Sequence, residues 1–197
     1  MRASTRREFV AGPVGKIECA VDAPAGPARG TALVAHPHPQ FGGTLDNKVV
    51  QTLAKAFVEL GYEAWRPNFR GIGESEGSYD GGPGEIEDLL SVFKEISSGK
   101  TVLAGFSFGA AMQATLATRV RAERMVLVGL AVGNFAVPKV PADTIVIHGE
   151  QDETVPLAAV LDWARPQDLP VVLVPGADHF FHRKLHLLRS IVQGSWK

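Results

Sequence analysis

Cysteine is nearly absent from this 197-residue chain, in which Cys19 is the only one. A single thiol excludes an internal disulfide and a cysteine-based metal cluster, and it is typical of a packed side chain in a reducing compartment. The chain also lacks an excess of charge of either sign, because its 20 basic and 21 acidic residues give a net charge of −1. With no run rich in Lys or Arg, we expect no nucleic-acid partner and no anionic membrane partner.

Long apolar runs are missing as well. No stretch approaches the roughly 18 apolar residues that a membrane-crossing helix needs. Residues 5–10, TRREFV, look like the start of a twin-arginine export signal, but Gly12, Pro13, Gly15 and Lys16 interrupt the apolar segment that should follow. We therefore expect a cytoplasmic protein.

The chain contains enough apolar sequence, 45% of its residues, for a substantial core, and we expect one domain over residues 1–197. Short apolar runs alternate with amphipathic segments after an initial hairpin. Such alternation predicts an α/β fold with a mostly parallel twisted sheet, helices on both faces and an N-terminal antiparallel hairpin. The expected strands are residues 6–10, 16–21, 31–36, 62–66, about 102–104, 124–130, 144–148 and 170–174, and the expected helices are residues 45–60, 85–97, about 108–118, 157–164 and 182–192.

The pentapeptide GFSFG, residues 105–109, follows the third buried strand and precedes a segment of small residues. A G-x-S-x-G sequence between a strand and a helix is typical of a nucleophile elbow, whose sharp turn exposes the serine hydroxyl. Gly105 and Gly109 suit this turn, because a Cβ there would crowd the neighbouring strand or helix. The motif predicts that Ser107 is a nucleophile.

A serine nucleophile needs a base, and the base needs an orienting acid. Asp152 lies in HGEQDETVP after one strand, and His179 lies in PGADHFF after the next. The order serine, acid, histidine is the one expected on this fold. Ligands of such sheets bind beyond the carboxyl ends of the strands, where all three loops lie. We therefore predict a Ser107–His179–Asp152 triad.

These three motifs resemble those of the α/β-hydrolase superfamily. The segments HPHPQFGGTLDNKVV (residues 36–50) and NFRGIGESEGSYDGGPGE (residues 68–85) are also similar to those of small bacterial serine hydrolases related to dienelactone hydrolase. The resemblance implies an acyl-enzyme mechanism more than a substrate. Dienelactone hydrolase itself uses a cysteine nucleophile, which Ser107 replaces here.

The oxyanion of such a mechanism needs backbone donors. Phe108 N–H, which follows the nucleophile, is the first, and the second comes from the loop after residues 31–36. Pro37 and Pro39 have no N–H, so His38 N–H is the best candidate, with Gln40 and Phe41 behind it. The link over residues 131–141 is too short for a helical cap, which predicts an open site with no cap domain. Its expected substrate-binding residues are Gln40, Phe41, Phe106 and Phe180.

Other polar residues have structural interpretations. Arg70 either touches substrate or, as we favour, braces the loops beneath the site, and Asp178 caps its own loop or the final helix. The remaining histidines lack acidic or thiol partners at ligand spacing, so we expect no metal and no cofactor.

The favoured function is hydrolysis of a small carboxylic ester or thioester. A peptidase or amidase with the same triad stays open, because the machinery is shared. So does a non-catalytic binding protein that keeps the hydrolase fold. Haloalkane dehalogenation is disfavoured, because it requires a carboxylate in place of Ser107. The oligomeric state is not predicted.

Overall fold

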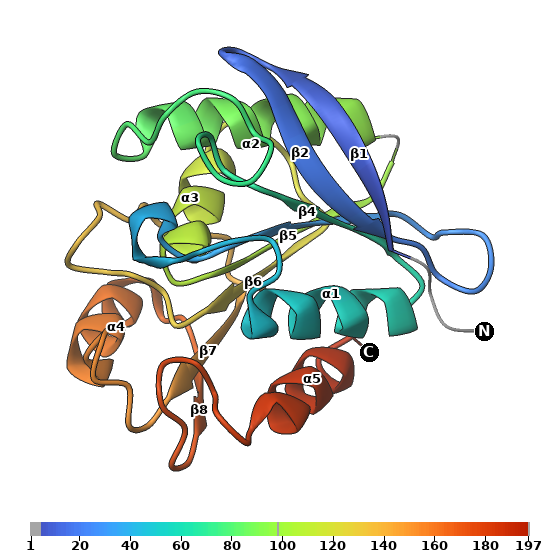
Figure 1. Ribbon diagram of the computed structural model, residues 1–197. Helices are drawn as coiled ribbons and strands as arrows, with labels where there is room; N and C mark the ends of the chain where they lie inside the picture. The colour runs from blue at the N-terminus through green and yellow to red at the C-terminus, as the bar shows by residue number, and fades with distance from the viewer. Residues whose placement is uncertain (1–4, 98, 197) are drawn as a thin grey trace.

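The computed structural model describes residues 5–97 and 99–196, and its strands form one eight-stranded sheet in the order β1-β2-β4-β3-β5-β6-β7-β8 (Figure 1). The strands are β1 (Thr5–Gly12), β2 (Gly15–Asp22), β3 (Thr31–Ala35), β4 (Glu63–Pro67), β5 (Thr101–Phe106), β6 (Arg124–Val128), β7 (Ile145–Gly149) and β8 (Val171–Val174). The helices are α1 (Lys48–Glu59), α2 (Pro83–Ile96), α3 (Phe108–Leu116), α4 (Leu157–Ala164) and α5 (Leu185–Gly194), with short 3₁₀ turns η1 (Pro39–Phe41) and η2 (Arg165–Gln167).

The sheet is mixed in the way that the sequence pattern predicts. β1 pairs antiparallel with β2, and β2 pairs antiparallel with β4. Every later pairing, from β4–β3 to β7–β8, is parallel. The predicted hairpin and the predicted parallel sheet are therefore confirmed, and Arg6 and Arg7 of the TRREFV segment lie in β1.

Helices cover both faces of the sheet, because the central strands are apolar on both sides. Successive residues of β3 alternate between the faces. Val34 packs in the cluster with Leu53 of α1 and Leu188 of α5, which lie side by side (Figure 1). Leu33 packs in the other cluster with residues of α2, α3 and α4, among them Leu89.

Two helices begin later than the sequence-based expectation, for local reasons. The first was expected at residue 45, but α1 begins at Lys48, because the Asn47 side chain accepts the N–H groups of Val49 and Val50 and caps the helix there. The last was expected at residue 182, but Phe181 and Arg183 have φ of 55° and 62°. Those left-handed conformations are incompatible with a helix, and α5 begins only after them.

The connection between β6 and β7 contains no helix and no strand at any of residues 129–144, all of which the structure describes. This is the place where a cap would be inserted, so the expected absence of a cap domain is confirmed. Among the described residues, no helix is both long and apolar enough to cross a membrane.

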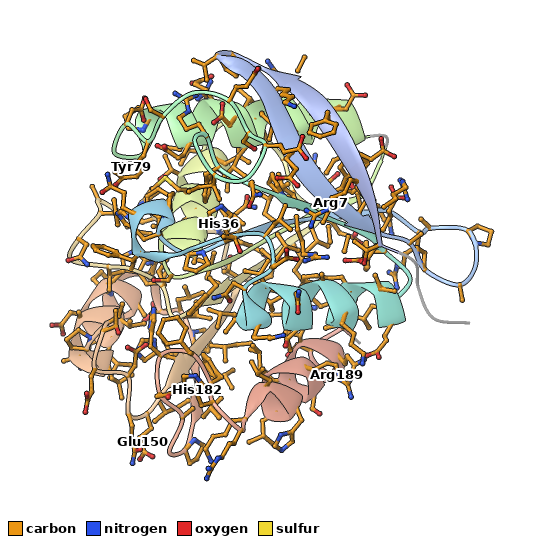
Figure 2. All side chains as sticks on the ribbon, viewed as in Figure 1. Arg7, His36, Tyr79, Glu150, His182 and Arg189 are labelled. Atoms are coloured by element: carbon orange, nitrogen blue, oxygen red, sulfur yellow. The ribbon has the colours of Figure 1, made fainter. Side chains whose placement is uncertain are left out.

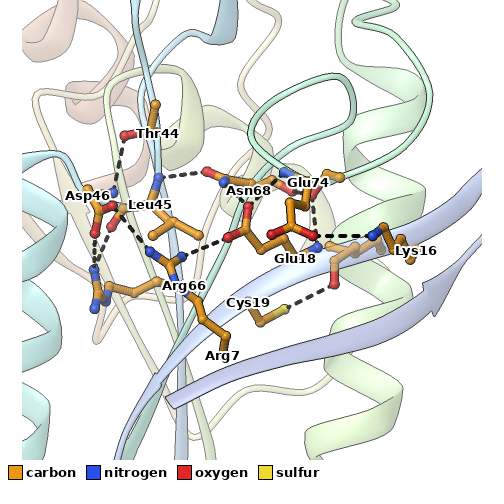
Figure 3. Close-up of polar contacts among 12 residues, drawn as sticks. Arg7, Lys16, Glu18, Cys19, Thr44, Leu45, Asp46, Arg66, Asn68 and Glu74 are labelled. Atoms are coloured by element: carbon orange, nitrogen blue, oxygen red, sulfur yellow. Dashed lines mark hydrogen bonds and ion pairs between the residues drawn. The ribbon is translucent and has the colours of Figure 1, made fainter. Parts of the chain in front are cut away.

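A polar network ties the N-terminal hairpin to the loops after β3 and β4 (Figure 3). Glu18 of β2 accepts hydrogen bonds from Asn68 Nδ2 at 2.8 Å and from Glu74 N–H at 2.9 Å. Asn68 Oδ1 in turn accepts the N–H of Leu45 at 2.8 Å. These bonds fix two of the loops that surround the candidate site.

Candidate active site

Ser107 lies in the turn between β5 and α3 and has φ 55° and ψ −116°. A non-glycine residue in this region costs about 1–3 kcal/mol, so the surrounding structure must hold it. Ser107 N–H donates to Val128 O at 2.9 Å, and Ser107 O accepts the N–H groups of Ala110 and Ala111. The strained, well-anchored turn is that of a nucleophile elbow.

The two glycines of the motif are required by close approach. A Cβ at Gly105 would lie 2.5 Å from the main chain of Gly109, and one at Gly109 would lie 2.4 Å from His36 O. Real Cβ atoms do not come so near to backbone atoms, so the crowding expected at both positions is confirmed.

The structure brings the three predicted triad residues together from three separate loops. His179, in the loop after β8, places Nε2 3.0 Å from Ser107 Oγ. Its Nδ1 lies 2.6 Å from Asp152 Oδ2, in the loop after β7. All three side chains are buried, and Ser107 retains 8% exposure. Figure 2 labels Glu150 and His182, which mark the acid and histidine loops at the lower left.

His179 is not the only donor to the Asp152 carboxylate. Oδ1 accepts the N–H groups of Thr154 at 2.9 Å and Val155 at 2.8 Å, while Oδ2 faces His179. Burial by itself raises the pKa of Asp152, but the hydrogen bonds from His179 and Val155 outweigh it and leave the pKa below its usual value. The carboxylate is thus ionised at neutral pH and can stabilise a cationic imidazole.

The two backbone N–H groups predicted to bind the oxyanion have no acceptor within the described part of the chain. Phe108 N–H is the first in α3 and has no intrahelical partner, and His38 N–H likewise donates to no described atom. The alternatives on the same loop are engaged, because Gln40 N–H donates to His38 Nδ1 and Phe41 N–H donates to His38 O. Among the three loop candidates, only His38 N–H is free to bind an oxyanion.

His36 is a functional candidate that the sequence did not distinguish from its neighbours. The ring is fully buried, Nδ1–H donates to Pro37 O at 2.7 Å, and Nε2 accepts Phe69 N–H at 3.0 Å. Pro37 O and His38 N–H belong to the same trans peptide group, in which the C=O and the N–H point in opposite directions. The hydrogen bond from His36 to Pro37 O therefore also orients His38 N–H. Burial lowers the pKa of His36 to about 4, so the ring is neutral. Figure 2 labels it near the middle of the view.

His148 was also missed, for the same reason. It is fully buried on β7, donates from Nε2 to Val155 O at 3.0 Å, and places that nitrogen 3.7 Å from Asp152 Oδ2. Burial lowers its pKa, although the nearby Asp152 charge opposes the shift. Sequence alone shows only an HG dipeptide at a strand end, which names no partner.

The expected substrate-binding residues separate into two groups. Phe106 does not line the site: it is fully buried, and its ring lies 4.8 Å from that of His179. The expectation that Phe106 binds substrate is therefore wrong, because this side chain, at the end of β5, is packed in the core against His179. Phe41 and Phe180 are 85% and 45% exposed, and their rings lie 4.6 Å from His38 and 5.2 Å from His179. Gln40 is exposed on η1.

Arg70 and Asp178 have the bracing and capping roles expected of them. Arg70 is buried and donates to both oxygens of Asp88 at 2.8 Å and to Gly84 O at 2.7 Å, which joins its loop to α2. Asp178 accepts the N–H of His182 at 3.0 Å, in the turn that precedes α5. Within residues 5–97 and 99–196, no group of three His, Cys, Asp or Glu side chains has the arrangement of a metal site.

Comparison with known proteins agrees with this geometry. An α/β serine hydrolase homologue from Coxiella burnetii is 38% identical with a TM-score of 0.90, over 98% of this chain and 97% of that one. A Xanthomonas campestris α/β serine hydrolase, described as having no lid, is 36% identical with a TM-score of 0.90, over 99% and 94%. An uncharacterised Rickettsia prowazekii protein is 31% identical over 194 residues, which are 88% of this chain and 81% of that protein.

No family model matches the chain. Sequence identity above 30% nevertheless extends over most of the chain in these relatives, and the two solved structures share its fold almost throughout. The protein is therefore a hydrolase that belongs to the α/β serine hydrolases of the α/β-hydrolase superfamily.

Proposed function

We propose that this protein hydrolyses a small carboxylic ester or thioester through an acyl-enzyme on Ser107. The observation that carries the proposal is the continuous chain of contacts from Asp152 through His179 to Ser107 Oγ, at 2.6 and 3.0 Å. In this chain the serine has a base within hydrogen-bond reach, and the base has an orienting carboxylate.

In the first half-reaction, Ser107 Oγ attacks the carbonyl carbon while its proton passes to His179 Nε2. The negative charge that develops on the carbonyl oxygen is stabilised by Phe108 N–H and His38 N–H, and each such donor is worth roughly 3 kcal/mol in kcat. Asp152 stabilises the imidazolium. As the tetrahedral intermediate collapses, His179 returns the proton to the departing alcohol or thiol.

In the second half-reaction, water replaces the alcohol. His179 removes a proton from the water, the hydroxide attacks the acyl carbon, and a second tetrahedral intermediate forms at the same two donors. Collapse releases the carboxylic acid, and the proton on His179 Nε2 restores the Ser107 hydroxyl. The link between β6 and β7 contains no helix that could cover the site. This supports small esters that approach from solvent as substrates, in preference to long lipid chains.

The test is covalent labelling with a fluorophosphonate probe, followed by peptide mass spectrometry and by assays with ester, thioester and amide substrates. We expect an adduct on Ser107, cleavage of esters or thioesters, and loss of both in Ser107→Ala. Ser91→Ala is a matched control, because Ser91 lies on α2 and its hydroxyl bonds only its own helix, at Glu87 O. It should label and react like the wild type.

The outcomes separate the alternatives. Cleavage of amides at rates equal to or above those of esters would point to a peptidase or amidase with the same triad. An intact, folded protein that acquires no adduct and cleaves nothing would contradict the proposal and favour a binding protein that retains the hydrolase fold.

A further inference from the structure

Tyr79 lies in the loop between β4 and α2, half-buried, with its hydroxyl oxygen 3.0 Å from His38 Nε2. Figure 2 labels it at the upper left, at the end of the molecule where this loop emerges. His38 is the residue whose main-chain N–H is the second candidate oxyanion donor. The same residue therefore faces the reacting carbonyl through its backbone and Tyr79 through its imidazole.

The direction of the Tyr79–His38 hydrogen bond follows from the other ring nitrogen. Gln40 N–H donates to His38 Nδ1 at 3.3 Å, so Nδ1 carries a lone pair. Burial lowers the pKa of His38, which keeps the ring neutral, and a neutral imidazole has its proton on the other nitrogen. Nε2–H thus donates, and the Tyr79 oxygen accepts.

This direction leaves the phenolic proton of Tyr79 unused. Burial, reinforced by the negative charges of Glu85 and Asp80, raises the pKa of Tyr79, so the proton is retained. Within the described ranges, no side-chain or backbone acceptor takes it. A half-buried O–H group with no acceptor in the protein can donate to water or to a bound ligand.

The position of this donor relative to the reaction identifies which part of the substrate it meets. The leaving group must lie near His179, from which it takes its proton, so the acyl chain extends on the other side of the carbonyl, past the oxyanion donors. The Tyr79 ring lies 4.9 Å from that of His38 and 6.0 Å from that of Phe108, the two residues with free N–H groups. Tyr79 is therefore on the acyl side.

Aromatic rings provide an apolar surface around the same place. Phe135, from the link between β6 and β7, is half-buried and lies 5.1 Å from the ring of Phe108. The exposed Phe41 ring lies 4.6 Å from that of His38. An acyl group that reaches Tyr79 passes along rings, which favours an apolar chain between the carbonyl and the acceptor.

The charge near Tyr79 disfavours anions. Asp80 and Glu85 both act on the Tyr79 hydroxyl, and the buried Arg70 of the same loop is already engaged by Asp88 and Asp80. A carboxylate on the acyl chain would approach a cluster in which the single Arg70 guanidinium already faces the three carboxylates of Asp80, Glu85 and Asp88, and it would gain no free cationic partner.

We propose that Tyr79 is a specificity-determining residue whose hydroxyl donates to a neutral oxygen acceptor, such as a keto or ether oxygen, on the acyl chain of the substrate. The inference rests on the proposed ester or thioester hydrolysis, and it selects keto- or alkoxy-acyl groups over plain alkyl chains and over chains that end in a carboxylate.

The test compares p-nitrophenyl esters with one leaving group and closely matched acyl chains: hexanoate, 4-oxohexanoate, 5-oxohexanoate and the monoester of glutaric acid, each corrected for uncatalysed hydrolysis. For the wild type, we expect kcat/KM for at least one keto ester to exceed that of hexanoate about 10-fold, with the glutarate ester below both. Tyr79→Phe should lower kcat/KM of the preferred keto ester about 5- to 10-fold and change that of hexanoate less than about twofold.

Tyr62→Phe is the matched control, because it removes the hydroxyl of the other tyrosine, which bonds Glu123 and Trp196 in a different part of the fold. It should leave the keto-to-alkyl ratio unchanged. Equal losses for keto and plain esters in Tyr79→Phe would show that Tyr79 only supports His38, and a wild type without keto preference would also overturn the inference. Preference for the glutarate ester would refute the charge argument. Failure to cleave any ester or to label Ser107 would instead contradict the proposed function itself.

Discussion

Gly109, the second residue of α3, lies directly against the main chain of His36 at the end of β3. A Cβ at Gly109 would be 2.4 Å from His36 O and 2.5 Å from Ala35 O. The helix that follows Ser107 and the strand that leads to the proposed oxyanion loop are thus in contact because Gly109 has no side chain. We therefore expect the separation between Phe108 N–H and His38 N–H to depend on this contact.

Replacing Gly109 by alanine should therefore damage catalysis as well as stability. The methyl group would force α3 and β3 apart, which displaces the two N–H donors relative to each other, and loss of one oxyanion donor costs about 10²–10³ in kcat. We expect Gly109→Ala to lower both kcat and the melting temperature. Gly194→Ala is the control, because Gly194 lies in α5 with nothing within 4 Å of an added Cβ. Unchanged kcat in a folded Gly109→Ala protein would contradict the role of this contact.

His36 should make stability depend on pH in a defined window. Its pKa is about 4 in the folded protein and 6.5 without the fold, so between these values the unfolded state binds more protons. Stability is then complete above about pH 6.5 and is lost as the pH falls towards 4. At about 1.4 kcal/mol per pH unit, the free energy of unfolding should fall by about 3 kcal/mol across this pH window.

The measurement is urea unfolding of the wild type and His36→Gln at pH 7, 5.5 and 4.5. Glutamine does not titrate, so the difference in unfolding free energy between the two proteins should shrink as the pH falls. Asp152, whose pKa is lowered, loses its contribution only below its usual value of 3.8, outside this window. A difference that stays constant from pH 7 to 4.5 would contradict a buried, neutral His36.

Local sequence signals were sufficient for the order of elements and for the triad. Apolar runs and the glycines at positions 105 and 109 are local features, and Ser107, Asp152 and His179 each follow a recognisable strand. Because parallel strands bring their carboxyl ends to one edge, the order of the motifs implied that they meet. The roles of Ser107, Asp152 and His179 in catalysis, like those of Phe108 and His38, stay predictions until they are tested.

What the sequence did not predict depends on contacts between distant segments. His36 and His148 resemble any loop or strand-end histidine until Phe69 and Val155 are seen to lie beside them. Phe106 carried the same apolar signal whether it faced substrate or lay beneath His179. The start of α5 was displaced by the left-handed φ of Phe181 and Arg183, which no pattern in those residues specifies.

Arg70 should stabilise the fold through its buried, two-pronged contact with Asp88. A lysine ammonium cannot reproduce the two parallel hydrogen bonds to Asp88 and at the same time donate to Gly84 O. Arg70→Lys should therefore leave Asp88 incompletely paired. Breaking a buried ion pair costs about 3–5 kcal/mol, and we expect a loss towards that size in urea unfolding. Arg119→Ala is the control, because Arg119 pairs with the adjacent helix residue Glu87 at the surface and should matter little. Equal losses of unfolding free energy in Arg70→Lys and Arg119→Ala would show that the buried ion pair contributes no more to stability than the surface pair.

His148 should affect turnover through the acid, without touching substrate. His148 Nε2–H donates to Val155 O, and Val155 N–H donates to Asp152 Oδ1. The histidine therefore fixes the loop that directs the Asp152 carboxylate at His179. His148→Leu leaves Val155 O buried without a donor, which costs about 1–3 kcal/mol of stability.

Because the bound substrate contacts none of these atoms, we expect kcat of His148→Leu to fall about 10-fold while KM changes less than about twofold, since about 1.4 kcal/mol of misalignment corresponds to that factor. His148→Gln, whose amide can still donate to Val155 O, should recover part of the loss. His186→Leu is the control on the exposed face of α5 and should change neither constant. If His148→Leu keeps full kcat, or if Gln gives no recovery in a stably folded protein, then Val155 holds Asp152 without help from the histidine.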